Sequence, residues 1–505
     1  MSGAERRSGW RGQKARVRAP PEPPLQHAVS RDRAFTEAVH GLYRSRPDLS
    51  AFGPGPRWLP WIGLPCVSAL SAGLVLQPLA TLATLGALLL LPFLLAAALR
   101  VLAVFEILVA PRPRIAPPPS TPAADAALPR YTVLVPLYDE AGVLPSLVAA
   151  LSRLDYPSDR LEIILVLEAR DLATRRAAAS TRLPPGMRWI VVPEGGPRTK
   201  PKALNYALAF SSGDLVVVYD AEDRPEPGQL RLAAAAFRRA SPGLACVQAR
   251  LNVYNPADSF LTRQFTLEYS SLFDGLLPAL QRLSLPIPLG GTSNHFRTDI
   301  LRAVGAWDPY NVTEDADLGI RLARSGYRTE TLASTTWEEA PVSRRIWIGQ
   351  RTRWIKGWMQ TWLVHMRRPG RLLRELGLWR FLGVQVVMGG VLLSALAYPL
   401  ALAGLALATL YGTGGAPDTP WAIAARHVAV AAFVIGMSAP VLSAAAAVAR
   451  RRWVWLVPWA FLMPVYWLLV SWAGYRALVE LFHRPFHWEK TRHGLSLARR
   501  FARRS

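Results

Sequence analysis

The sequence has little charge and almost no cysteine. Only 19% of its 505 residues are charged, against about 25% in a typical soluble domain, and 51% are hydrophobic. This composition argues against an ordinary cytosolic enzyme. The two cysteines, Cys66 and Cys246, exclude a disulfide framework, and neither has other ligands at metal-binding spacing. The first 50 residues contain no apolar core of a secretory signal peptide.

Two nucleotide-binding signatures are also missing. No GxGxxG follows the first predicted strand, and GxxxxGK followed by Ser or Thr occurs nowhere in the chain. These absences disfavour a Rossmann dehydrogenase and a P-loop NTPase. Acidic residues are scarce as well, since 35 Asp and Glu against 59 Lys and Arg leave a formal net charge of +24. The basic residues gather beside apolar runs and at the chain ends, so we expect them to contact anionic lipid rather than nucleic acid.

Long runs without any charged residue are present instead. They cover 58–99, 381–417, 427–449 and 453–475. A transmembrane helix needs about 20 residues, so the first run is long enough for two crossings, with Gln77 and Pro78 as the break. We therefore expect two transmembrane helices in 57–110 and about three transmembrane segments in 380–482.

The basic flanks predict the orientation of these segments. The Arg-rich region 1–56 is expected to be disordered and cytoplasmic, and two crossings return the chain to the cytoplasm for the polar region that follows. The tail 483–505 has seven Lys or Arg against one Glu, so it also favours the cytoplasm. Five full crossings would place it outside. Either one segment is re-entrant, with Pro458 and Pro464 favouring the last one, or the number of spans is wrong.

The polar region between the apolar runs alternates strands and helices. After a Pro-rich linker at 111–129, apolar strands are predicted at 131–136, 161–166, 187–192 and 215–219. Helices are predicted at 142–154, 171–180 and 201–212. Nearly all-apolar strands separated by such helices indicate a parallel sheet covered on both faces. Ligands of these sheets bind beyond the carboxyl ends of the strands, so the residues that follow each strand are the candidates.

Acidic residues follow three of the four strands. They are Asp139 and Glu140 after the first, Glu168 after the second, and Asp220, Glu222 and Asp223 after the fourth. Each acidic loop taken singly could be a solvated turn. Together the carboxylates suit Mg²⁺ or Mn²⁺, which takes one or two carboxylates and completes its shell with substrate phosphates.

Four ordered motifs extend this pattern. They are VPLYDE at 135–140, DAED at 220–223, TED at 313–315 and QRTRW at 350–354. The set resembles the inverting family 2 glycosyltransferases, and more narrowly the membrane-embedded synthases with a QxxRW motif, such as cellulose-synthase-like enzymes. The similarity covers 129–363. It implies an α/β GT-A catalytic domain at 130–345, inserted between transmembrane helices, and interfacial helices with QxxRW at 346–379.

The resemblance also implies roles for the motif residues and a nucleotide-sugar donor with Mg²⁺ or Mn²⁺. Asp315 matches the catalytic base of the TED motif. The donor-binding positions are Asp139, Glu140, Glu168, Lys202 and Asp220. The metal-binding positions are Asp220, Glu222 and Asp223. The acceptor and diphosphate positions are Gln350, Arg353, Trp354, Gly291, Thr292 and Glu314.

Several of these positions keep an alternative interpretation. Glu168 and Glu222 are Glu where the family usually has Asp. Lys202, like Lys200, could bind donor phosphate at a helix start or could be part of an exposed charge pair. The glycine loop that contains Gly291 could be a plain turn. Trp354, Trp358 and Trp362 lie four apart on one helix face, which suits either a membrane interface or a buried helix.

Three functions follow from these observations. The leading hypothesis is a bacterial inner-membrane synthase that adds sugar, with UDP-glucose as the expected donor, to a growing polysaccharide, alone or with export or accessory subunits. The alternative is transfer of a single sugar to a membrane lipid, either a glycolipid precursor or a polyprenyl phosphate. The third is a non-catalytic membrane scaffold with a decayed transferase domain, which the intact Asp220, Asp315 and Arg353 oppose.

Overall fold

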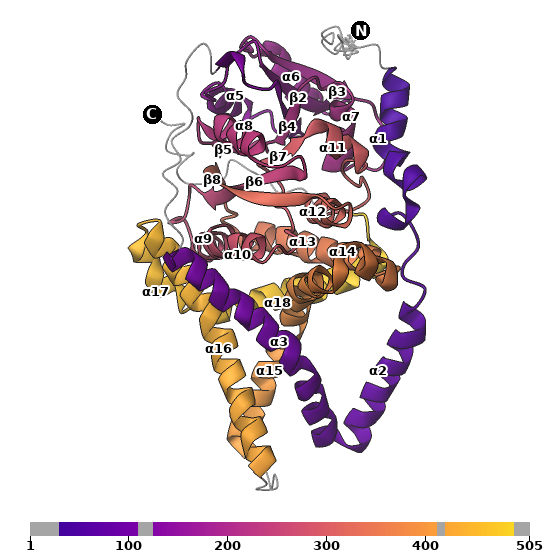
Figure 1. Ribbon diagram of the computed structural model, residues 1–505, viewed down its shortest axis with the longest axis vertical. Helices are drawn as coiled ribbons and strands as arrows, with labels where there is room; N and C mark the ends of the chain where they lie inside the picture. The colour runs from indigo at the N-terminus through magenta and orange to yellow at the C-terminus, as the bar shows by residue number, and fades with distance from the viewer. Residues whose placement is uncertain (1–29, 110–124, 412–419, 489–505) are drawn as a thin grey trace, which may run out of the picture.

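The computed structural model describes residues 30–109, 125–411 and 420–488. A mixed sheet with its covering helices forms one end of the molecule, and long apolar helices form the other (Figure 1). A layer of helices lies between them. It includes α9 (Phe260–Ser271), α10 (Leu277–Arg282) and α13 (Arg344–His365). The candidate motifs at 313–315 and 350–354 lie at this junction.

The sheet has eight strands in the order β3-β2-β1-β4-β7-β6-β8-β5. The strands are β1 (Tyr131–Leu137), β2 (Leu161–Glu168), β3 (Met187–Val192), β4 (Leu215–Val218), β5 (Arg224–Pro225), β6 (Leu244–Val253), β7 (Asn294–Arg297) and β8 (Arg328–Glu338). Strands β1 to β4 are mutually parallel, as the sequence predicted. The expectation of a wholly parallel sheet was wrong, because β7 is antiparallel to both β4 and β6. The chain passes through α9 and α10 before β7, so that strand enters the sheet from the opposite end.

Both faces of the sheet are buried. Alternate residues of β1 face opposite sides, so that Val133 and Val135 belong to one core and Leu134 to the other. The first core is closed by α5 (Leu144–Leu151) and α8 (Gln229–Arg239). The second core is closed by α1 (Arg31–Ser45), α7 (Lys200–Leu208), α11 (Thr298–Ala303) and α12 (Glu314–Arg324). The remaining helix of the sheet domain, α6 (Leu172–Ser180), follows β2 and is capped by Asp171.

Helix α1 differs from the disordered N-terminus that the sequence predicted. Its buried residues Ala34, Ala38 and Leu42 recur every four positions, which makes one apolar stripe on an otherwise polar helix. Two of them, Ala34 and Ala38, pack into the second core. The surrounding Arg and Glu residues hid this stripe in the composition. Residues 1–29 lie outside the described part of the chain.

The apolar helices match the predicted membrane segments. Helices α2 (Leu59–Leu76) and α3 (Pro78–Val109) are separated at Gln77, where the sequence predicted a break. The other candidates are α14 (Pro369–Val384) continuing into α15 (Gly390–Tyr411), and α16 (Pro420–Arg450). Within the described residues, four helices are long and apolar enough to cross a membrane.

A fifth candidate is bent, as the two prolines predicted. The segments Val454–Ala460 and Met463–His483 meet at 64°, and α17 (Val457–Ala460) and α18 (Met463–His483) form its two arms. In Figure 1, α18 lies close to α13 and crosses the direction of α15 and α16. Ala473 and Ala477 of α18 pack against Ile355 and Met359 of α13. Helix α13 is therefore buried on its α18 side. This favours a buried helix over a membrane-interface helix for the segment that carries Trp354, Trp358 and Trp362.

Candidate active site

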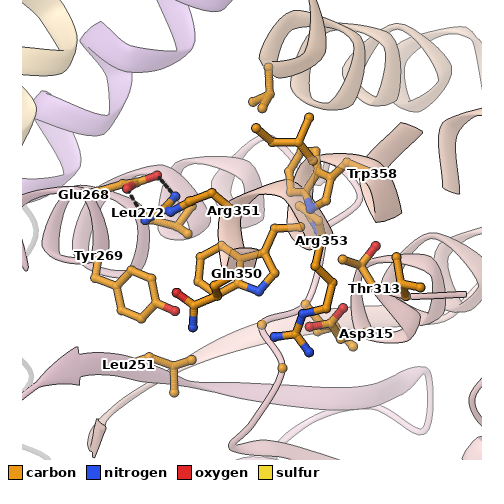
Figure 2. Close-up of a pocket in the computed structure, with 18 of the residues that line it drawn as sticks. Leu251, Glu268, Tyr269, Leu272, Thr313, Asp315, Gln350, Arg351, Arg353 and Trp358 are labelled. Carbon is orange, nitrogen blue, oxygen red and sulfur yellow. Dashed lines mark hydrogen bonds and ion pairs between the residues drawn. The ribbon is translucent and has the colours of Figure 1, made fainter. Parts of the chain in front are cut away.

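One cavity joins the ends of the strands to the apolar helices. Its volume is about 1130 Å³. At the sheet end it is lined by Glu140, Glu168, Asp220 and Glu222, and at the far end by side chains of α3, α15, α16 and α18. The middle of the cavity is lined by the TED and QxxRW residues (Figure 2). The structure therefore brings together residues that are more than 200 positions apart.

Two of the predicted acids, Asp139 and Asp223, do not line this cavity. The backbone N–H of Asp139 donates to Oδ2 of Asp171 at 2.5 Å, and Asp139 has a positive φ of 55°. Asp223 is buried, and its Oδ2 accepts from the backbone N–H of Asp220 at 2.7 Å and from the hydroxyl of Thr292. Neither side chain is among those that line the cavity. Both hold the loops that carry Glu140 and Asp220.

The carboxyl groups of the acidic residues after β4 lie close together, and their burial and mutual repulsion disfavour the charged forms. Burial, and next the charge of Asp220, raise the pKa of Asp223 to about 7, and the same two causes raise the pKa of Glu222 well above its ordinary value. Burial also raises the pKa of Glu338 strongly. The Oδ1 atom of Asp223 is buried without a hydrogen-bond partner. A divalent cation would neutralise this cluster and could satisfy that oxygen, so the residues fit a bound Mg²⁺ or Mn²⁺.

The protein alone does not complete a metal shell here. Among the described residues, no group of three or more His, Cys, Asp or Glu side chains is arranged to hold a metal ion. Mg²⁺ is commonly bound by one or two carboxylates together with substrate phosphates.

The two lysines at the start of α7 face different partners. Lys200 Nζ lies 2.5 Å from Oδ1 of Asp220 and donates to the carbonyl of Gly291 at 2.7 Å. Lys202 Nζ lies 3.1 Å from Oε2 of Glu168 and is fully buried. Only Lys200 lines the cavity. The sequence predicted Lys202 as a donor-binding residue; the structure places it beside Glu168 and places Lys200 beside Asp220.

Asp315 lies in the first turn of α12, at the wall of the cavity. Its Oδ1 accepts from the backbone N–H of Ala316 at 2.8 Å, and a Cβ added to Gly291 would lie 3.3 Å from its Oδ2. The glycine loop therefore passes close to the carboxylate. Burial raises the pKa of Asp315, and burial followed by the charge of Asp315 raises the pKa of Glu314 to about 7.

The QxxRW residues project from α13 into the same space. Figure 2 shows the guanidinium of Arg353 next to Asp315, and Gln350 between Tyr269 and Arg353. The guanidinium of Arg353 also lies 5.0 Å from the centre of the Trp488 ring. Trp354 stacks on Tyr269, with ring centres 6.3 Å apart. Gln350, Arg353 and Trp354 all line the cavity, together with Gly291, Thr292 and Glu314.

One prominent feature was missed from the sequence. Arg351 forms two hydrogen bonds with Glu268, at 2.6 and 2.5 Å, and Tyr466 donates to the same carboxylate at 2.8 Å (Figure 2). Burial would lower the pKa of Arg351, but Glu268 raises it above its ordinary value. Glu268 is 83 positions from Arg351 and belongs to no motif, so nothing in the sequence pointed to the pair.

Two further buried polar residues of the domain, His295 and Asp317, have structural partners. His295 is buried, and its Nδ1 lies 2.6 Å from the hydroxyl of Tyr131, while burial lowers its pKa to about 3. Asp317 is buried between Arg321, at 2.6 Å, and His365, at 3.0 Å. Burial would raise the pKa of Asp317, but Arg321 and next His365 hold it below its ordinary value. These contacts give Asp317 a supporting role in the fold.

Comparison with known proteins shows what the sheet region is similar to. Residues 129–357 match the family described as glycosyltransferase like family 2. The probable glycosyltransferase YdaM of Bacillus subtilis is 31% identical over 234 residues, which are 46% of this chain and 55% of that protein. The β-monoglucosyldiacylglycerol synthase of Synechocystis is 30% identical over 287 residues, 55% of this chain and 58% of the relative. The chain thus spans little more than half the length of these two relatives.

More distant proteins are also similar to this chain. The cellulose synthase 1 catalytic subunit of Komagataeibacter xylinus is 26% identical over 250 residues, covering 48% of this chain and 32% of that protein. Among solved structures, the mannosyltransferase PcManGT from Pyrobaculum calidifontis, in complex with GDP-Man and Mn²⁺, has a TM-score of 0.47 and 23% identity. That alignment covers 79% of this chain and 99% of PcManGT. The structure itself has the predicted α/β domain, with a mixed sheet and flanking apolar helices.

Proposed function

We propose that the protein transfers a sugar from a nucleotide-diphosphate donor to a membrane lipid, since residues 129–357 match the family described as glycosyltransferase like family 2. The observation that carries this proposal is the single cavity that connects the strand-end acids with the apolar helices. A lipid tail can lie among the apolar side chains while its headgroup reaches the acids. Transfer proceeds with inversion, in one displacement on the cytoplasmic side of the membrane.

The donor diphosphate binds at the sheet end. Asp220 and Glu222 would hold a divalent cation there, which supplies Lewis-acid stabilisation of the departing diphosphate. Lys200 and Arg353 add fixed positive charge at the same place, and a guanidinium can form paired hydrogen bonds with phosphate. Glu140 and Glu168 line the cavity where the nucleoside would lie. A charged donor of this kind explains why three strand ends meet at one pocket.

Asp315 is the proposed catalytic base. An alcohol is a weak nucleophile, so a carboxylate within hydrogen-bond reach must take its proton as the bond to the sugar forms. Asp315 lies beside the glycine loop and Arg353, between the donor end and the apolar end of the cavity. The raised pKa of this buried carboxyl makes its ionised form a stronger base than an exposed aspartate.

The lining of the far end favours a lipid over a growing glycan. Side chains there are mostly apolar; they include Phe93, Ala96, Ala97, Leu272, Val387, Val391, Met437 and Val470. A hydrated polysaccharide would need many hydrogen-bonding groups along its path. The synthase of Synechocystis, whose name describes a glucosyldiacylglycerol product, supports the same choice.

Polysaccharide synthesis from UDP-glucose remains the second candidate. The QxxRW residues and the similarity to cellulose synthases support it. Aromatic side chains could also hold a sugar ring by stacking, and Trp354, Trp358 and Trp467 line the cavity. The two candidates differ in their product, so product analysis separates them.

The test uses the full-length protein in membranes beside an Asp315→Asn variant. Radiolabelled nucleotide sugars are supplied in turn, with Mg²⁺ or Mn²⁺ and with EDTA. Label is then divided into ethanol-insoluble polymer, chloroform-soluble lipid and free sugar. We expect metal-dependent label in the lipid fraction of the wild type alone. Polymer lost in the variant would establish the second candidate, and no incorporation from any donor would favour the non-catalytic scaffold.

A further inference from the structure

An arginine lies inside one of the apolar helices and faces the cavity. The candidate span Thr84–Val109 of α3 contains Arg100, and the residues of α3 that line the cavity include Phe93, Ala96, Ala97 and Arg100. Their spacing of three, four and seven positions defines one helix face. Charged residues in membrane segments are costly and usually mark a ligand or substrate path. Arg100 therefore needs a partner of opposite charge.

The described part of the protein does not provide that partner at close range. Among these residues, Arg100 makes no hydrogen bond and no ion pair within 4 Å, whereas Glu106 on the same helix is paired with Arg282. Glu268 attracts Arg100 electrostatically, but its carboxylate is already held by Arg351 and Tyr466. Arg100, Arg351 and Glu268 all line the cavity, so the one carboxylate that attracts Arg100 is already engaged by Arg351.

We propose that Arg100 binds the phosphate of an anionic lipid acceptor whose headgroup also carries a free hydroxyl. The apolar side chains of α3, α15 and α18 surround the acyl chains, Arg100 holds the phosphate, and the hydroxyl beyond the phosphate reaches Asp315. The inference rests on the proposed function and specifies its acceptor. A neutral diacylglycerol would leave the charge of Arg100 uncompensated.

The choice of a hydroxyl follows from the candidate base. A phosphate oxygen is already ionised and needs no base to attack a sugar, whereas an alcohol does. Asp315 lines the same cavity as Arg100, and in this proposal one headgroup offers a phosphate to Arg100 and a hydroxyl to Asp315. Phosphatidylglycerol is a suitable probe, since it has both groups, while phosphatidic acid has only the phosphate and diacylglycerol only the hydroxyl.

Binding is measured first, without donor, by isothermal titration calorimetry on the full-length protein in neutral detergent. The probes are dioctanoyl phosphatidylglycerol, dioctanoylglycerol and glycerol 3-phosphate. We expect phosphatidylglycerol to bind about tenfold more tightly than dioctanoylglycerol, because it gains a charge-assisted hydrogen bond. Arg100→Gln should abolish this preference, and Arg100→Lys should keep part of it. Glycerol 3-phosphate should bind weakly, since it lacks acyl chains.

Arg57→Gln is the matched control for general attraction between arginine and anionic lipid. Arg57 is exposed at the start of α2 and should not affect the preference. Equal affinities for the two lipids in the wild type, or an unchanged preference in Arg100→Gln, would overturn the inference. Tight binding of glycerol 3-phosphate would assign the site to a free phosphate compound instead. The wild-type comparison decides the question even if Arg100→Gln does not fold.

A second experiment supplies radiolabelled nucleotide sugar together with each lipid. Label should enter phosphatidylglycerol but not phosphatidic acid, and label in dioctanoylglycerol alone would contradict an anionic acceptor. Binding without any transfer would leave the anion site intact and count against the proposed function. The two failures are therefore distinguishable.

Discussion

At the scale of single residues, Asp315 carries the proposed chemistry. Replacing it with Asn keeps its size but removes the charge that accepts a proton. We expect Asp315→Asn to lower kcat by about 10²- to 10⁴-fold while donor affinity changes little. Initial transfer rates and donor titration on purified protein measure the two effects. Asp299→Asn, on the exposed surface of α11, is the control. A variant with normal kcat would remove Asp315 from the mechanism.

Asp317 supports the fold rather than the reaction. It lies between Arg321 and His365 with no exposure to solvent, so Asp317→Asn leaves two buried basic groups without their carboxylate. Breaking a buried pair of this kind costs about 3–5 kcal/mol. We expect a clear fall in Tm for Asp317→Asn, measured by thermal unfolding in detergent. An unchanged Tm would show that the pair contributes nothing net.

The same residue gives a pH dependence of stability. Because Arg321 and His365 hold the pKa of Asp317 below its ordinary value, the folded protein binds this proton less readily than the unfolded chain. The stabilisation is therefore present above the unfolded pKa of about 3.9 and is lost as pH falls below it. Tm measured from pH 6 to pH 3 should fall more steeply in the wild type than in Asp317→Asn. Parallel curves would contradict this assignment.

At the scale of elements, close packing of α13 against Thr313 brings the QxxRW and TED motifs together. A Cβ at Gly357 of α13 would collide with the side chain of Thr313. Gly357→Ala should therefore push α13 away from Asp315 and destabilise the protein by about 1–3 kcal/mol, with a loss of transfer activity. Tm and kcat are measured together.

Gly370→Ala serves as the matched control for that prediction. Gly370 is in the first turn of α14, and a Cβ added there would meet no atom within 4 Å. Alanine has the higher helix propensity, so this variant should be neutral or slightly stabilising. Equal effects of the two substitutions would mean that close packing at Gly357 does not matter.

At the scale of the whole molecule, the bent segment decides the topology. Helix α18 packs along α13 and is bent by 64° from the preceding turn, so we expect it to remain near the cytoplasmic surface rather than cross the membrane. Four crossings then place both chain ends on the same side. Protease treatment of sealed inside-out vesicles, with an epitope tag at either end, should remove both tags. Protection of only one tag would establish a fifth crossing.

The sequence predicted much of this organisation because the signals were local. Four apolar strands, the break at Gln77, the bend near Pro458 and the cavity position of Asp315 follow from composition or motifs within short windows. The antiparallel β7 and the helix α1 were not predicted. Pairing direction depends on where the intervening chain runs, and a three-residue apolar stripe is weak within a basic segment.

Tertiary structure alone decided which charged groups meet. Lys200 and Lys202 are two positions apart, so they point to different sides of a helix, and only packing showed that Lys200 faces Asp220. The Glu268–Arg351 pair and the position of Arg100 depend on segments far apart in the chain. The sequence by itself determined the resemblance to family 2 glycosyltransferases, the apolar helices and the motif residues, because each depends on residues within short stretches of the chain. The shared cavity arises only when those separate helices pack against the sheet domain.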